Sequence, residues 1–182
     1  MSYDLWGRLR YMLSPQFDIY EQVSKIVHGN VIDIGSGTGF GTHLFARNAS
    51  AVIGCEIDET ALRFSQKAFS NGKVSFHSLD ITQPIAPASY DFVTMIDVIE
   101  HIKKDALAVK NCCDLLNENG TFIVSTPNRL SRYRKSEYHV REYSPDELKE
   151  LLSSVFDNVD MVDFQLKPME SDYTNPILAI CL

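Results

Sequence analysis

The sequence lacks an apolar stretch long enough to cross a lipid bilayer. Its longest uninterrupted apolar run is Ile177–Leu182, whereas a membrane-spanning helix needs about 20 residues. Near the N-terminus, Arg8 and Arg10 stand among apolar side chains, but the continuous apolar core of a secretory signal is missing. These absences predict a cytoplasmic protein without a membrane span.

The sequence also lacks cysteine pairs at the spacing of redox or zinc motifs. It has 4 cysteines, and none is followed by another at the third position after it. Cys112 and Cys113 are neighbours in a stretch of helical composition, so they cannot share one face of a helix. We expect reduced thiols, as is usual in a cytosolic protein.

Positive charge is scarce as well. The chain has 17 Lys and Arg against 24 Asp and Glu, which gives a formal net charge of −7. A non-specific nucleic-acid binder needs a broad basic surface, so the net charge argues against that class. A nucleic acid could still be a substrate if the protein contacts only its terminus. The 182 residues contain no repeat and no linker, which predicts one domain over residues 1–182, with an arm and a helix in residues 1–30.

One stretch, residues 31–39, organises the rest of the chain. Val31–Ile34 is a short apolar run with β-branched residues, which indicates a buried strand. Three glycines at alternate positions follow it, and glycine allows a sharp turn and the close approach of a ligand to the main chain. Residues 40–47 then have helical composition. A strand, a glycine loop and a helix in this order form a nucleotide-type cradle at the carboxyl edge of a parallel sheet.

The glycine spacing differs from that of a dinucleotide-binding loop. In that loop the third glycine stands five positions after the first, and the residue here is Phe40. An NAD-linked oxidoreductase therefore stays an alternative that the spacing disfavours. A second apolar strand, Ala51–Cys55, ends at Glu56. An acid about 20 residues past a glycine loop is placed to bind the hydroxyl groups of a ribose.

The loop and the acid together resemble the class I methyltransferases that depend on S-adenosylmethionine (SAM), and the resemblance extends over residues 31–182. It implies an α/β fold of three layers, Rossmann-like, with a seven-stranded, mostly parallel sheet whose last strand is antiparallel and inserted between strands five and six. It also implies SAM as cofactor and S-adenosylhomocysteine as product. The residues that would bind SAM are Asp33, Gly35, Ser36, Gly37, Gly39, Glu56, Ile57, Asp80, Ile81 and Asp97.

The remaining pattern agrees with alternating strands and helices. A helix is expected over residues 17–27, and Asp58 or Glu59 begins another. Ser144, Pro145 and Glu147 form the capping-box signature of a later helix. We expect a helix-ending turn over residues 117–120. The further strands are expected at residues 74–77, 90–97, 121–125, 156–166 and 176–182.

Two acids and an imidazole stand where the fourth strand ends. Asp97, Glu100 and His101 would share one side if a helical turn follows the strand. The pattern resembles that of ubiquinone-type O-methyltransferases and small-RNA 2′-O-methyltransferases. That resemblance implies a divalent metal bound by Asp97, Glu100, His101 and the later His139. The alternatives are His101 or His139 as a general base beside Glu100, and histidines with a purely structural role.

The segment 126–143 is long and irregular, which is typical of functional loops, and we expect it on the substrate side. Within it, residues 127–141 hold the basic residues Arg129, Arg132, Arg134, Lys135 and Arg141, against the single acid Glu137. The functional interpretation is recognition of an anionic acceptor by arginine side chains, and the alternative is an ordinary solvated surface.

The sequence thus predicts an enzyme that moves a methyl group from SAM to a small-molecule or nucleotide-like acceptor, at oxygen. The alternatives are the NAD-linked oxidoreductase and a SAM-binding module without catalysis.

Overall fold

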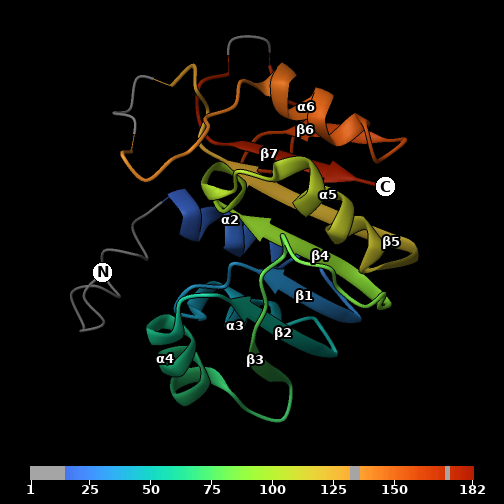
Figure 1. Ribbon diagram of the computed structural model, residues 1–182. Coiled ribbons are helices and arrows are strands. Elements are labelled where there is room, and N and C mark those ends of the chain that lie inside the picture. The colour runs from blue at the N-terminus through green and yellow to red at the C-terminus, as the bar shows by residue number, and fades with distance from the viewer. Residues whose placement is uncertain (1–14, 132–135, 171–172) are drawn as a thin grey trace.

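The computed structural model describes residues 15–131, 136–170 and 173–182, and these contain a seven-stranded sheet (Figure 1). The strand order is β3-β2-β1-β4-β5-β7-β6, and β7 is antiparallel to both of its neighbours. The predicted fold class is therefore confirmed. The strands are β1 (Asn30–Ile34), β2 (Ala51–Glu56), β3 (Val74–Ser78), β4 (Tyr90–Ile96), β5 (Leu116–Thr126), β6 (Val159–Val162) and β7 (Ile177–Cys181). The helices are α2 (Pro15–Val23), α3 (Phe40–Phe45), α4 (Glu59–Phe69), α5 (Asp105–Asp114) and α6 (Pro145–Ser153), with the 3₁₀ turn η1 (Ile99–His101).

Apolar cores lie on both faces of the sheet, because neighbouring side chains of a strand point to opposite faces. Val31 packs with α2 and α3 on one face, and Ile32 packs with α5 and α6 on the other. The same alternation places Ile123 and Val124 in different cores. Helices thus cover both faces (Figure 1), which makes the three layers. The ligand edge of such a sheet is the one where the parallel strands end.

Two helices, α4 and α6, begin at capping residues that the sequence indicates. Asp58 accepts a hydrogen bond from the main-chain N–H of Ala61 and begins α4. Ser144 and Glu147 form the reciprocal capping box of α6, with distances of 3.3 and 2.8 Å. Within the described ranges, every helix is too short or too polar to span a bilayer.

Three element boundaries differ from the sequence-based expectation. The expected turn at residues 117–120 lies inside β5, where the pairing with β4 shifts register between Tyr90 and Phe92. Strand β6 ends at Val162 because the carboxylate of Asp163 accepts hydrogen bonds from two following main-chain N–H groups and closes a turn. Helix α2 ends at Val23, and hydrogen bonds of the 3₁₀ type tighten the turn that follows it.

Candidate active site

The glycine loop between β1 and α3 has a backbone that other residues rarely adopt. Gly35, Gly37 and Gly39 have φ angles of 72°, 53° and 79°, in the left-handed region. A Cβ atom at Gly35 would come within 2.4 Å of Val98, whereas a Cβ atom at Gly37 would meet open space. The main chain at Gly37 is therefore accessible to a ligand.

Asp33 lies on β1, two positions before this loop, and its side chain is fully buried. Its buried carboxylate accepts hydrogen bonds from the hydroxyl groups of Tyr20, Thr42 and Thr94, at 3.2, 2.5 and 2.7 Å. Burial raises the pKa of Asp33 to about 6, although the three hydroxyl donors act in the opposite direction. Because the Asp33 side chain is fully buried, the expected direct contact with SAM finds no exposed carboxylate oxygen in this structure, and the three hydrogen bonds join the end of β1 to α2, α3 and β4. Ser36 is also buried, close to Gly54.

Glu56, at the end of β2, binds the glycine loop directly. Its carboxylate accepts hydrogen bonds from the main-chain N–H groups of Gly37, Ile57 and Asp58, at 2.8, 2.7 and 2.9 Å. A carboxylate has about four acceptor positions. These three bonds leave capacity for a ribose hydroxyl group, and they hold the carboxylate at the edge of the sheet.

A pocket of about 660 Å³ lies at this edge, a size typical of cofactor sites. The expected SAM-binding residues that line it are Gly35, Glu56, Ile57, Asp80, Ile81 and Asp97, and His101 lines it too. Asp33, Ser36, Gly37 and Gly39 do not line it. Sequence reasoning missed the other lining residues: Ile34, Cys55, Asp58, Leu79, Thr82, Val98, Ile102, Lys103 and Lys104. Most of them stand at or within a few positions of a strand's carboxyl end, whereas Ile102, Lys103 and Lys104 lie between η1 and α5.

Asp80 and Ile57 give the pocket polar and apolar surface. The Asp80 carboxylate accepts hydrogen bonds from Thr82 and Gln83, and the Thr82 hydroxyl group in particular lowers the pKa of Asp80. Asp80 is therefore a turn former and a pocket residue at once. Ile57 is 68% exposed, which leaves an apolar surface at the pocket for a planar ring.

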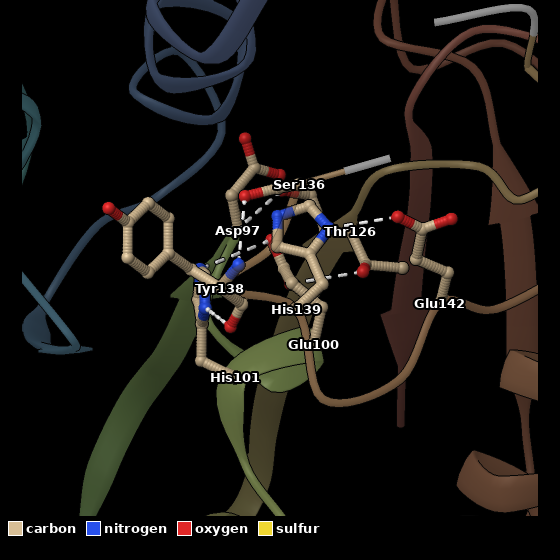
Figure 2. A network of polar contacts seen from close by, with 9 residues as sticks. Asp97, Glu100, His101, Thr126, Ser136, Tyr138, His139 and Glu142 are labelled. Carbon is tan, nitrogen blue, oxygen red and sulfur yellow. Dashed lines mark hydrogen bonds and ion pairs between the residues drawn. The ribbon is translucent and has the colours of Figure 1, made fainter. Parts of the chain in front are cut away.

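Beyond Asp97, the pocket edge continues into a cluster of carboxylates and imidazoles (Figure 2). Asp97 has a φ angle of 53° and accepts a hydrogen bond of 2.7 Å from the hydroxyl group of Ser125. The turn η1 follows and places Glu100 in the interior, where it is 1% exposed and accepts a hydrogen bond of 3.0 Å from Thr126. Burial, together with the charge of Asp97, raises the pKa of Glu100 to about 8. Burial likewise raises the pKa of Asp97.

The loop after β5 delivers His139 to the same place. The main-chain N–H groups of Val140 and Arg141 donate to the carbonyl oxygen of Glu100, at 2.8 and 3.2 Å. The rings of His101 and His139 lie 5.0 Å apart between centroids, at an angle of 78°. Atoms of Glu100, His101 and His139 that could bind a metal all lie within 4.8 Å of one another. Asp97 is outside that group, so the structure brings together three of the four expected ligands.

Two of the loop's arginines are paired with carboxylates of the protein. Arg129 forms an ion pair of 2.9 Å with Glu147, and Arg141 forms one of 2.9 Å with Asp105. Arg141 also lies over the ring of Tyr143, 4.6 Å from its centroid. The expected recognition of an anionic acceptor therefore draws no support from these two side chains. Arg132, Arg134 and Lys135 lie outside the described residues.

The fold and the pocket together define the Rossmann-like class I methyltransferases. The family described as "Methyltransferase domain" matches residues 32–124, and the chain belongs to this family of SAM-dependent methyltransferases. It is 34% identical over 140 residues to the Mycobacterium tuberculosis protein named "Probable S-adenosylmethionine-dependent methyltransferase Rv3030", covering 74% of this chain and 51% of that one. It is 30% identical over 116 residues to a "Ubiquinone biosynthesis O-methyltransferase" of Leptothrix cholodnii, covering 61% and 49%. The chain thus spans about half the length of the curated relatives it matches.

Solved structures share the fold. A SAM-dependent methyltransferase from Clostridium acetobutylicum superposes with a TM-score of 0.75 at 15% identity, covering 97% of this chain and 95% of that one. The structure titled "DhpI-SAH complex structure" gives a TM-score of 0.72 at 16% identity, covering 96% and 86%.

Proposed function

We propose that this domain binds SAM in the pocket and transfers its methyl group to an oxygen atom of a small-molecule or nucleotide-like acceptor. The supporting observation is that the cofactor pocket is continuous with the carboxylate–imidazole cluster. Asp97 and His101 line the same pocket as the glycine loop and Glu56, and they also begin the carboxylate–imidazole cluster. A cofactor held at one end of the pocket therefore presents its reactive part to the titratable groups at the other end.

Each pocket residue has a role that follows from its chemistry. The main chain of the glycine loop, at Gly35 in the pocket and at the open Gly37 beside it, receives the methionine part of SAM, and Glu56 accepts hydrogen bonds from the ribose. Asp80 accepts from the adenine amino group, while Ile57 and Ile81 enclose the ring. These assignments give SAM both apolar surface and a few oriented polar groups, as is typical of cofactor sites.

Methyl transfer itself depends mainly on alignment. A lone pair of the acceptor oxygen forms a bond to the methyl carbon, the bond from carbon to sulfur breaks, and its electron pair stays on sulfur. The acceptor hydroxyl group also loses a proton, which an imidazole nitrogen of His101 or His139 accepts as general base. The buried Glu100 beside them stabilises the imidazolium when its carboxylate is ionised, and because burial raises its pKa to about 8, this contribution grows as the pH rises.

A divalent metal is the second candidate for this edge. One carboxylate and two imidazoles make a mixed oxygen and nitrogen donor set that suits several divalent ions. A metal bound by Glu100, His101 and His139 would lower the pKa of the acceptor hydroxyl group. The protein's own part would be to hold the three side chains in place.

Oxygen as the acceptor atom is supported by the relatives named ubiquinone biosynthesis O-methyltransferases. The surface next to the cluster adds a second indication. Tyr138 is 74% exposed and Val140 is 50% exposed, although the main chain of both is anchored on η1. We infer that the acceptor carries a planar or apolar group that packs on these side chains.

A thermal-shift comparison of S-adenosylhomocysteine with NAD, each with and without divalent metal, tests the cofactor. A ligand at 100 times its dissociation constant stabilises the fold by about 2.7 kcal/mol, so S-adenosylhomocysteine should raise the melting temperature and NAD should leave it unchanged. Stabilisation by NAD alone would overturn the proposal. Methyl transfer to a panel of phenols and nucleosides then separates an enzyme from a binding module.

A further inference from the structure

Both histidines of the cluster are held at Nδ1 by an oxygen atom (Figure 2). Nδ1 of His101 lies 3.0 Å from the main-chain oxygen of Tyr138. Nδ1 of His139 lies 3.1 Å from Oε1 of Glu142. A carbonyl oxygen and an ionised carboxylate accept hydrogen bonds and donate none. The proton of each neutral ring is therefore on Nδ1, and Nε2 carries the lone pair.

The two rings meet inside the cluster, and Nε2 of each ring lies on the side away from the partner of Nδ1. Nε2 of His101 lies 3.9 Å from Oε1 of Glu100. The ring of His139 lies between Glu142 and His101, since it bonds to the first and its centroid is 5.0 Å from the ring of the second. The lone pair of His101 is thus available next to Glu100, and a potential ligand atom of His139 lies within 4.8 Å of those of Glu100 and His101.

The side chain of Glu142 is held in place by burial and by the fixed main chain of its loop. Its side chain and that of His139 are each only 13% exposed, so water screens their interaction less than it screens a surface pair. The loop that carries both residues is fixed on η1 by the two main-chain hydrogen bonds to the Glu100 carbonyl oxygen. A carboxylate that accepts from the far nitrogen of a functional histidine fixes its tautomer and its ring orientation.

We propose that Glu142 is a positioning residue that holds His139 with its proton on Nδ1, and so aims Nε2 at the reacting edge. This inference rests on the proposed function only for its effect on turnover. It holds whether His139 binds a metal or takes the proton of the acceptor, because both roles need an unprotonated Nε2. Glu142 itself contacts neither reactant.

Long-range ¹H–¹⁵N NMR of histidine-labelled protein measures the tautomer without any acceptor. The spectra are recorded at about pH 8.5, well above the ordinary pKa of histidine, and the resonance of His139 is assigned with the variant His139→Gln. The expected result is the Nδ1–H form in the unaltered protein and a loss of that preference in Glu142→Ala. The variant Glu142→Gln should retain it, because the amide oxygen still accepts. An unchanged tautomer in Glu142→Ala overturns the proposal.

Steady-state kinetics supplies the second measurement. Glu142→Ala should lower kcat roughly 10- to 100-fold with the KM for SAM unchanged, and Glu142→Gln should recover part of the loss. Glu150→Ala, at an exposed glutamate on α6, serves as matched control and should leave kcat unchanged. Unaltered kcat in a folded Glu142→Ala protein overturns the positioning role. The expected tautomers without any methyl transfer would instead refute the proposed function alone.

Discussion

The main-chain N–H of Gly37 donates a hydrogen bond of 2.8 Å to the carboxylate of Glu56. This bond joins the glycine loop after β1 to the end of β2, across two adjacent parallel strands. Two further main-chain donors, from Ile57 and Asp58, hold the same carboxylate. The residue expected to bind the ribose is therefore also one that shapes the loop for the methionine part of the cofactor.

Replacement of Glu56 by alanine should weaken SAM binding. The variant leaves ribose hydroxyl groups without an acceptor and releases the Gly37 N–H, so the expected loss is about 2–3 kcal/mol of binding free energy. Isothermal titration calorimetry measures it. Glu59→Ala is the matched control, since Glu59 forms an ion pair with Arg63 on the exposed surface of α4. Unchanged SAM affinity in Glu56→Ala would contradict the assignment of Glu56, at the end of β2, as the residue that binds the ribose.

Because of Asp33, the free energy of unfolding should depend on pH between the pKa of this group in the unfolded chain and its pKa in the folded protein. Its pKa is about 6 in the folded protein, against 3.8 for an aspartate in the unfolded chain, so the folded state binds the proton more tightly. The stability that this group contributes is therefore complete below pH 3.8 and is lost as the pH rises through about 6. This contribution is about 3 kcal/mol.

The variant Asp33→Asn tests this linkage. Asparagine cannot ionise, so the unfolding free energy of the variant, measured in urea, should lack this loss between pH 4 and pH 6 relative to the unaltered protein. Asp157→Asn, at an exposed position, is the control and should follow the unaltered protein. Parallel pH profiles for Asp33→Asn and the unaltered protein would show that Asp33 titrates normally.

Much of the pocket was predictable because parallel strands end at one edge of a sheet. Glu56, Asp80 and Asp97 each follow a recognisable apolar strand, and all three line the pocket. The burial of Asp33 was not predictable in this way, because its surroundings include Thr94, which stands 61 positions further along the chain. Glu142 was missed for a different reason. Its partner His139 stands only three positions before it, but an irregular segment has no helical or strand period that predicts which of its side chains face each other.

Replacement of Tyr138 by alanine should affect the acceptor and not the cofactor. The side chain is 74% exposed beside the cluster, so its loss should cost little stability and should remove packing surface for a planar acceptor. We expect the KM for the acceptor to rise by roughly 10-fold, the range of one lost aromatic contact, while calorimetry shows unchanged SAM affinity. Tyr138→Phe is the control and should restore the KM. An unaltered KM in the alanine variant would show that Tyr138 does not contact the acceptor.

The last prediction concerns whether His101 and His139 act as one unit. If they share a metal or a proton path with Glu100, then His101→Ala and His139→Ala should each abolish most turnover, and the double variant should be little worse than either, because losses within a functional unit are not additive.

SAM binding should survive in all three variants, since Gly35, Glu56 and Asp80 are unchanged. Activity that a chelator removes and added divalent metal restores would assign the unit to a metal, whereas chelator-resistant activity with a pH profile altered in only one variant would assign a general base. Full activity of both single variants on the true acceptor would make this edge structural, and the catalytic assignment would then be wrong.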